Sequence, residues 1–323
     1  MRRLSLLLRL ICAASVAGSS APALEHEQDD RHAESLTPTT DEAPTLDVMT
    51  FNLRVGGRQD CPPHAWPQRC QIASRLIQAS DPDIIGTQEG TYGQLRDLRS
   101  HLQDYDWIGL GRGGGSRGEF MAVFYRPTRL EPVEFDHFWL SDAPTTAASI
   151  TWGNRWVRMV TWVRFHDRRT DRGFYVLNTH LDYTSAQSRE QSAQLILDRV
   201  RTFDPQLPVL ITGDFGEPAS SGIAHRRLVG TGEFRDTWRE AITKGPEVGT
   251  FHRYRGAVGG GERIDWMLVR GAMRTLRAEI VTYAENGEYP SDHYPVIAQL
   301  EWQSGDRRDH GVHGQGESSG HER

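Results

Sequence analysis

The sequence of 323 residues lacks any apolar run that would cross a bilayer comfortably. The nearest candidate, Leu4–Ala17, is too short for this and is interrupted by Arg9. It follows Met-Arg-Arg and precedes three small residues, an order typical of a secretory signal peptide that is cleaved after Ala23. We therefore predict that residues 1–23 are removed and that the mature chain is exported (periplasmic or secreted), without stable membrane insertion.

Cysteine is almost absent, because the chain has only three and Cys12 would leave with the signal peptide. The remaining Cys61 and Cys70, together with His64, offer only three candidate metal ligands and form no Cys-x-x-Cys motif. This argues against a structural zinc site. Outside the cytoplasm, two cysteines nine positions apart predict a disulfide, with two reduced thiols as the alternative.

An excess of positive charge is also missing. The formal net charge is −6, and it becomes −9 without residues 1–23, because that segment carries three arginines and no acid. Nucleic-acid-binding proteins usually carry a basic face, so the balance argues against a tight, non-specific grip on duplex DNA. A nuclease is not excluded, because metal ions can carry much of the phosphate binding. The glycine-rich residues 111–118 lack the Gly-Lys-Ser/Thr of a nucleotide-binding P-loop and predict a flexible connector.

The two ends of the chain differ in composition from its middle. Residues 24–44 are acidic, contain proline and threonine, and predict a disordered lead. Residues 304–323 are rich in glycine, histidine, serine and charge, and predict a disordered tail, with weak metal binding by its histidines as the alternative. Residues 45–303 have the length of one large domain, which we expect to be monomeric.

Apolar periodicity within this domain predicts both strands and helices. The prolines at 62, 63 and 67 are expected to exclude regular structure from the loop that carries the cysteines. Several strand pairs are joined too briefly for a crossover helix, which favours mixed sheets with helices outside. Strands are expected at 46–53, 83–87, 120–125, 130–140, 158–165, 174–181, 209–212, 264–269, 278–283 and 296–302, and helices at 71–77, 92–102 and 186–200.

Polar side chains stand at or just beyond one end of five of these strands. A single polar dipeptide there is ordinary loop composition. Five together are typical of an active site built on a rigid sheet. The residues are Asn52, Gln88–Glu89, Asn178–His180, Gly213–Asp214 and Ser291–His293.

Six short motifs in this order resemble those of the endonuclease/exonuclease/phosphatase superfamily, which includes deoxyribonucleases, inositol-polyphosphate phosphatases and bacterial sphingomyelinases. The resemblance implies an α/β fold of the α+β type, a four-layer sandwich of two mixed sheets packed face to face and flanked by helices. The sequences of the motifs are most similar to those of a secreted bacterial branch of the superfamily, which implies no particular substrate. The motifs are Thr50–Asn52, Gln88–Glu89, Asn178–Asp182, Gly213–Phe215, Arg263–Trp266 and Ser291–His293.

The resemblance implies a divalent-ion site. Glu89 would be the first ligand and Asn52 would lie beside it, also close to the substrate phosphate. Asp292 would be a further ligand. Oxygen ligands of this kind suit Mg²⁺, with Mn²⁺ as an alternative. Without the resemblance, Glu89 would be an ordinary acid at a helix N-terminus.

The resemblance also implies two acid–imidazole pairs. His293 would be the catalytic imidazole and Asp265 the carboxylate that orients and charges it. His180 would be a second imidazole at the leaving group, with Glu119 as its acid partner. One pair on each side of a phosphate would form a coherent acid–base arrangement.

Two more residues and one departure complete the expected site. Asp214 would orient or deprotonate the attacking water, and Arg158 would contact the phosphate. The family motif ends in asparagine where this chain has Gly216. Without that amide, turnover would be slow. Gly216→Asn would then raise turnover by about tenfold, unless the backbone is at positive φ or another donor such as His252 fills the space.

These features predict an exported, Mg²⁺-dependent phosphoesterase that uses a water nucleophile. A phosphodiester is favoured somewhat over a phosphomonoester, and nucleic acid is a candidate substrate. A lipid-headgroup or sugar-phosphate esterase is the alternative within the same class. From another class, a catalytically weakened binding protein that keeps the cleft would explain Gly216.

Overall fold

The computed structural model describes residues 44–57, 60–257 and 261–303, all of which belong to one unit, Glu42–Arg323. The predicted signal peptide, the predicted lead apart from Pro44, and the predicted tail lie outside the described residues. No helix in the described part of the chain is both long and apolar enough to cross a membrane.

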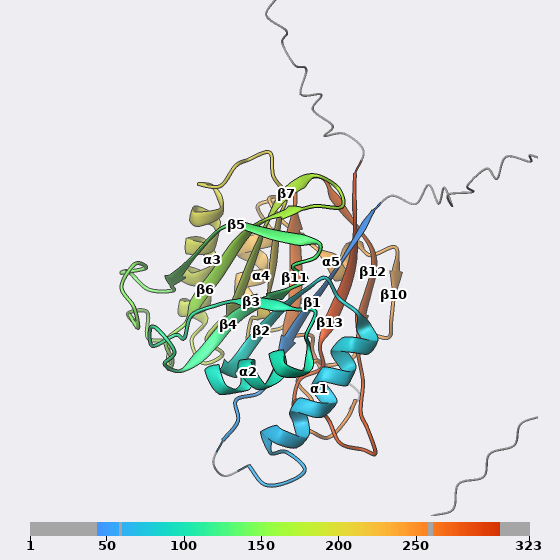
Figure 1. Cartoon of the computed structure of the whole chain (residues 1–323). Coiled ribbons are helices and arrows are strands. Elements are labelled where there is room, and N and C mark those ends of the chain that lie inside the picture. Colours follow the sequence, from blue (N-terminus) through green and yellow to red (C-terminus); the bar gives the residue numbers. More distant parts are fainter. Residues whose placement is uncertain (1–43, 58–59, 258–260, 304–323) are drawn as a thin grey trace, which may run out of the picture. The chain divides into compact units, whose positions relative to one another are not determined.

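The domain is built on two mixed sheets (Figure 1). The seven-stranded sheet has the order β10 (Thr243–Lys244), β12 (Met273–Ile280), β13 (Val296–Trp302), β1 (Thr45–Asn52), β2 (Ile84–Thr91), β4 (Glu119–Tyr125) and β3 (Asp106–Ile108). The six-stranded sheet has the order β5 (Leu130–Trp139), β6 (Met159–Asp167), β7 (Arg172–His180), β8 (Val209–Asp214), β11 (Asp265–Arg270) and β9 (Arg235–Asp236).

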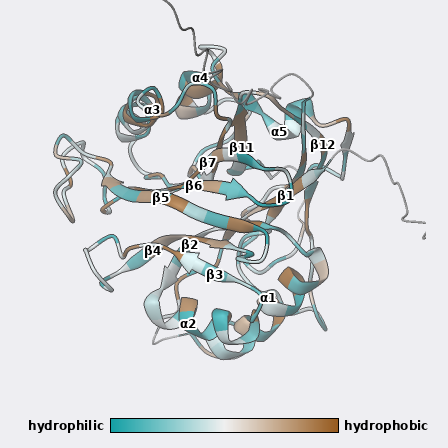
Figure 2. Cartoon of the chain, turned by 45° about the horizontal axis from the view of Figure 1, so that its top comes forward, coloured by the Kyte–Doolittle hydropathy of each residue, from teal (hydrophilic) through white to brown (hydrophobic). Residues whose placement is uncertain are grey.

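Helices cover the outer faces of both sheets, which gives the expected four layers (Figure 2). The helices α1 (Trp66–Ser80) and α2 (Tyr92–His101) pack on the seven-stranded sheet. On the six-stranded sheet lie α3 (Ala186–Val200) and α4 (Ile223–Val229), while the short α5 (Thr237–Glu240) packs beside β11 and β12. The predicted sandwich of two mixed sheets is confirmed.

Alternating side chains explain why the central strands are apolar along their whole length. In β7, Phe174 and Val176 join the core between the two sheets, while Tyr175 and Leu177 join the core beneath α3 and α4. Successive side chains of a strand point to opposite faces, and here both faces are covered. The apolar runs therefore mark strands buried on both sides.

The start of α1 differs from the prediction. Proline was expected to exclude regular structure up to Cys70, but the helix begins at Trp66 and Pro67 occupies its first turn. Proline is compatible with that position, because the first-turn N–H groups have no partner within the helix. The helix therefore starts five residues earlier than predicted from the apolar spacing.

The predicted disulfide between Cys61 and Cys70 is wrong, because Cys70 is a thiol in the structure. The longer α1 explains this. Cys70 lies within the helix, is 2% exposed and packs in the core beneath α1 and α2, whereas Cys61 is exposed in the preceding loop. Burial raises the pKa of the Cys70 thiol to about 12.

We expect Cys70 to stay unmodified when native protein without reductant is treated with iodoacetamide, and to react after unfolding. The thiolate is the reactive form, and the buried Cys70 stays protonated. Intact-mass analysis before and after denaturation measures this. Unfolded protein that is lighter by two hydrogen atoms and is not alkylated would show that a disulfide forms.

Candidate active site

Strand register brings the predicted polar residues to one end of the two sheets. In the parallel pair β1 and β2, Asn52 lies opposite Gln88; in the parallel pair β7 and β8, His180 lies opposite Asp214. Because neighbouring parallel strands end at the same edge, residues far apart in sequence become neighbours. The antiparallel strand β11 begins there with Asp265, opposite Asp214.

Two of the polar residues in the motifs join the sheets and do not line the cleft. Gln88 donates from Nε2 to Asn178 Oδ1 at 2.7 Å, and Asn178 Nδ2 donates to the carbonyls of Thr87 and Ala122. All are fully buried. The sheets come so close here that a Cβ on Gly86 would lie 2.1 Å from Thr212 Oγ1. The hydrogen bonds of Gln88 and Asn178 therefore fix the spacing of the two sheets.

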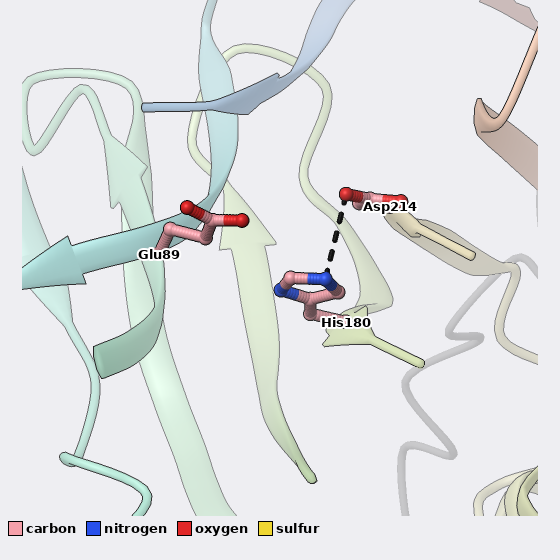
Figure 3. A group of neighbouring side chains, drawn as sticks. All are labelled: Glu89, His180 and Asp214. Atoms are coloured by element: carbon pink, nitrogen blue, oxygen red, sulfur yellow. Dashed lines mark ion pairs between the residues drawn. The ribbon is translucent and has the colours of Figure 1, made fainter. Parts of the chain in front are cut away.

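Glu89 leaves the regular path of β2 and enters the cleft. The pairing of β2 with β4 shifts register between Thr87 and Gly90, and Glu89 has φ 62°. A non-glycine residue in this left-handed region is uncommon and often marks a functional site. The irregularity turns the carboxylate toward His180 and Asp214, as Figure 3 shows.

Asn52 lies between two carboxylates. Its Nδ2 donates to Glu89 Oε1 at 3.2 Å and to Asp214 Oδ2 at 2.9 Å, and its Oδ1 accepts from the N–H of Arg54 at 2.8 Å. Burial opposes ionisation of Glu89, but the Val55 N–H, the charge of His293 and the Asn52 amide together hold its pKa below the ordinary value. Glu89 is therefore a carboxylate at neutral pH.

The donor set fits a divalent cation. Ligand atoms of Glu89, His180 and Asp214 all lie within 4.8 Å of one another. Asp292 lines the same cleft, and its pKa is raised by burial and, to a lesser degree, by the nearby charge of Glu89. The carboxylate oxygens among these atoms are the donors that Mg²⁺ and Mn²⁺ prefer. Glu89 and Asp292 keep the predicted place at the site, while Asn52 contributes here as a donor to carboxylates.

The predicted pair of His293 and Asp265 is present. His293 Nδ1 lies 2.8 Å from Asp265 Oδ2, and its Nε2 lies 3.9 Å from Asp214 Oδ2. Burial favours the neutral ring, but the charge and hydrogen bond of Asp265, with help from Asp214, raise the pKa of His293 to about 10. The Asp265 carboxylate thus orients the ring and keeps it charged.

Asp214 is the other buried acid of this cluster. Burial and the nearby charge of Asp265 raise its pKa to about 7, against the lowering effect of His293. Its Oδ1 accepts from the N–H of Gly216 at 2.9 Å. A carboxylate held in this way can orient a water and take its proton.

The second acid–imidazole pair differs from the expectation. Glu119 forms an ion pair with Arg112, at 2.7 Å between Oε2 and Nη1, and His180 lies instead next to Asp214, with 3.4 Å between Nε2 and Oδ2. The reason is the glycine-rich segment, which is an ordered turn that brings Arg112 opposite Glu119 through a 2.8 Å backbone hydrogen bond. Burial and then Arg158 hold the pKa of His180 well below its ordinary value, so the ring is neutral.

Arg158 reaches the cleft from the residue just before β6. It is 2% exposed, and within the described chain neither its Nε nor its Nη1 has a hydrogen-bond partner. An arginine buried without partners is costly unless an anion completes its hydrogen bonds. The predicted phosphate contact therefore has a geometric basis.

The cleft has a volume of about 670 Å³ and includes residues that the sequence did not single out. Arg54 Nε lies 3.7 Å from Asp292 Oδ2, and Arg253 lies over the ring of Phe251. Trp156 and Tyr183 are half-exposed at the cleft. The pattern of polar residues at strand ends does not reveal these residues, because all of them lie in loops.

Gly216 is fixed by its surroundings. It has φ 61°, and a Cβ there would lie 2.9 Å from both Cα and Cβ of Tyr183. His252, the suggested substitute donor, stacks on Tyr294 at 3.9 Å between ring centroids and does not line the cleft. The side chain that the family motif places here would collide with the segment that carries Tyr183.

We therefore expect Gly216→Asn not to increase turnover and to destabilise the fold by about 1–3 kcal/mol, the usual cost of overpacking. Gly115→Asn is the matched control, because Gly115 has nearly the same φ, 59°, with nothing within 4 Å of a Cβ. Chemical unfolding and kcat of the two variants measure the effect. A faster, equally stable Gly216→Asn protein would show that Tyr183 moves aside.

Comparisons with known proteins agree with this geometry. A family model described as Endonuclease/Exonuclease/phosphatase family matches residues 49–293. A solved endonuclease/exonuclease/phosphatase from Bacteroides vulgatus is 30% identical, with a TM-score of 0.77 over 80% of this chain and 100% of that one. A mannosyl-6-phosphatase from Bacteroides thetaiotaomicron VPI-5482 is also 30% identical, with a TM-score of 0.74 and the same coverage.

Curated relatives match a shorter stretch. An uncharacterized protein of Acanthamoeba polyphaga mimivirus is 28% identical over 162 residues, which are 47% of this chain and 59% of that protein. The chain thus spans about half the length of the curated relatives it matches. Because the family model covers well over half of the sequence, the chain belongs to the endonuclease/exonuclease/phosphatase family.

Proposed function

We propose that this chain is an exported, Mg²⁺-dependent phosphatase that hydrolyses phosphomonoesters of small molecules with a water nucleophile. The observation that carries the proposal is Arg158, a buried guanidinium at the cleft whose Nε and Nη1 have no hydrogen-bond partner among the described residues. The other cleft arginines near carboxylates are Arg112, paired with Glu119, and Arg54, beside Asp292. Arg253 also lines the cleft, but it is exposed and lies over Phe251, so the buried Arg158 is the arginine best placed to receive the substrate anion.

The preference for a monoester reverses the order that the motifs gave. The Glu119–His180 pair expected by analogy with deoxyribonucleases does not form, so the resemblance to those enzymes weakens at the leaving-group side. The net charge of the mature chain also disfavours nucleic acid. The similarity to a mannosyl-6-phosphatase supports a sugar phosphate as one substrate of this class.

The residues would divide the chemistry as follows. Glu89 and Asp292 would hold the cation, with Asn52 fixing the position of Glu89; the cation would neutralise charge on the phosphoryl oxygens. Asp214 would orient the attacking water and accept its proton. His293, charged by Asp265, would stabilise the negative charge that develops on the phosphate. His180 would lie beside the leaving oxygen.

The proposal is tested with purified chain lacking residues 1–23. Rates are measured on p-nitrophenyl phosphate, bis(p-nitrophenyl) phosphate, sugar phosphates and supercoiled plasmid, in EDTA and after adding Mg²⁺ or Mn²⁺. We expect monoester hydrolysis that EDTA abolishes and Mg²⁺ restores. Equal rates in EDTA would contradict the metal requirement, and faster diester cleavage or plasmid nicking would contradict the substrate class. Phosphate binding without turnover of any substrate would indicate the weakened binding protein.

Export is tested separately by cell fractionation of the full chain and of a chain lacking residues 1–23. We expect the full chain outside the cytoplasm, shortened by the signal peptide, and the truncated chain inside. Unprocessed full-length protein in the cytoplasm would contradict export.

A further inference from the structure

Arg69 is a fully buried arginine on the inner face of α1. It donates to four backbone carbonyls, those of His64 at 2.7 Å, Leu53 at 2.6 Å, Arg54 at 3.0 Å and Pro290 at 3.1 Å. Within the described residues no carboxylate forms a salt bridge with it. Burial lowers its pKa, but a guanidinium stays charged in proteins.

A charge in this position is an unusual way to fill a helix face. The same face of α1 buries Leu76 and Ile77, which pack without any desolvation cost. Burying a charge costs several kcal/mol unless hydrogen bonds offset it, and an apolar residue often serves stability as well. The four carbonyls that accept hydrogen bonds from Arg69 belong to three separate segments. What Arg69 provides beyond an apolar side chain is therefore a fixed relative position of these segments.

The first of these segments is a strained turn at the end of β1. Arg54 has φ 55°, a left-handed conformation that costs a non-glycine residue about 1–2 kcal/mol. Its carbonyl accepts from Arg69 Nη2 and also from Gln94 Nε2, each at 3.0 Å. The turn directs the next N–H, that of Val55, to Glu89 Oε2 at 3.0 Å. The position of the Glu89 carboxylate therefore depends on a turn that Arg69 and Gln94 hold.

The second segment leads into the last motif. The Pro290 carbonyl, bound to Arg69, precedes Ser291, whose Oγ donates to the Asn52 carbonyl at 2.7 Å. Asp292 follows directly and lines the cleft. Arg69 thus joins the end of β1 to a segment that lies 221 residues after Arg69 in the chain, and both segments carry predicted metal ligands.

We propose that Arg69, with Gln94, positions the metal-binding side of the cleft by holding the Arg54 turn against the segment before Asp292. This inference rests on the proposed metal-dependent function and goes beyond it, because Arg69 lies outside the cleft and touches no reacting group. Arg69 sets the distance between Glu89 and Asp292.

The test compares Arg69→Lys with Arg75→Lys. Arg75 lies on the same helix, but its side chain is 48% exposed and its partner is Glu285, away from the cleft. Calorimetric titration with Mn²⁺ gives the metal Kd of each protein, and kcat and KM for p-nitrophenyl phosphate are measured across Mg²⁺ concentrations. A lysine ammonium cannot replace a guanidinium that spans four carbonyls.

We expect Arg69→Lys to raise the metal Kd by about 10- to 100-fold, the range found when groups supporting metal ligands are lost. Saturating Mg²⁺ should restore most of kcat with little change in KM, and Arg75→Lys should match the parent. A folded Arg69→Lys protein with a lower melting temperature but the parent's metal Kd would overturn the inference, because it would show a purely structural role.

Two further outcomes are decisive. If Arg69→Lys does not fold, Gln94→Met, which removes the other donor to the Arg54 carbonyl, is expected to raise the metal Kd, and an unchanged Kd would overturn the inference. If the parent binds no divalent ion in the titration, the proposed function fails together with this inference. Metal binding by the parent with unchanged variants overturns the inference alone.

Discussion

Replacing Glu89 with glutamine is expected to lower kcat by on the order of 10³-fold and to weaken divalent-ion binding, while the protein remains folded. The carboxylate is ionised, is held by the Val55 N–H and the Asn52 amide, and lies with His180 and Asp214 in the group of ligand atoms within 4.8 Å. Glutamine keeps the size of the side chain and can still accept the Val55 hydrogen bond. The change therefore removes chiefly the negative charge that would hold the cation.

Glu134→Gln is the matched control, because Glu134 is an exposed carboxylate on β5, outside the cleft. Circular dichroism checks the fold, calorimetry gives the metal Kd, and kcat is measured at saturating Mg²⁺. A Glu89→Gln protein that binds metal and turns over like the parent would falsify the assignment of Glu89 as the principal ligand. It would leave Asp214 and Asp292 as the carboxylates to test next.

Replacing His293 with alanine is expected to lower kcat by about 10³-fold, within the range for a positioned acid or base. Asp265→Asn should cause a similar loss, because the Asp265 carboxylate at 2.8 Å both orients the ring and keeps it charged. The two residues act as one unit, so Asp265→Asn should have little further effect in a His293→Ala background. His180→Ala should be less than additive with His293→Ala, because both rings lie beside Asp214 Oδ2, at 3.4 and 3.9 Å.

A buried histidine–aspartate pair outside the cleft provides the control. His225 Nε2 lies 3.0 Å from Asp236 Oδ2, outside the cleft. His225→Gln should lower the free energy of unfolding and leave kcat per folded molecule unchanged. Independent, fully additive effects of His293→Ala and Asp265→Asn would contradict the pairing and would assign Asp265 a role of its own.

The sequence predicted the long strands, but not the short β3, β9 and β10 or the helices α4 and α5. It also predicted which polar residues gather at one cleft, while their catalytic roles stay predictions. The central strands are apolar on both faces because helices cover both sheets, so β7 and β8 are visible as continuous runs. Where such strands are parallel neighbours, their ends meet, and the polar residues after them share one site. Asp214, His180 and Asn52 could be predicted for this reason.

Only the tertiary structure decided which partners these residues have. Glu119 was expected beside His180, but the glycine-rich turn brings Arg112 to it instead. Cys70 was expected in a disulfide, but the helix that begins at Trp66 turns it into the core. A hydrogen-bond partner depends on the direction of a side chain and on the path of a loop, and neither has a periodic signal in the sequence.

Arg69 and Gly216 show the same division most clearly. In the sequence, nothing distinguishes Arg69 from the other arginines, and Gly216 only stands where the family motif has asparagine. In the structure, Arg69 binds a backbone carbonyl 221 residues further along the chain, and Gly216 makes room for the backbone of Tyr183. The sequence determined the family, the strands and the residues at their ends, because local composition and spacing encode them. The fold decided how precisely those residues are held, because that depends on contacts between segments distant in the chain.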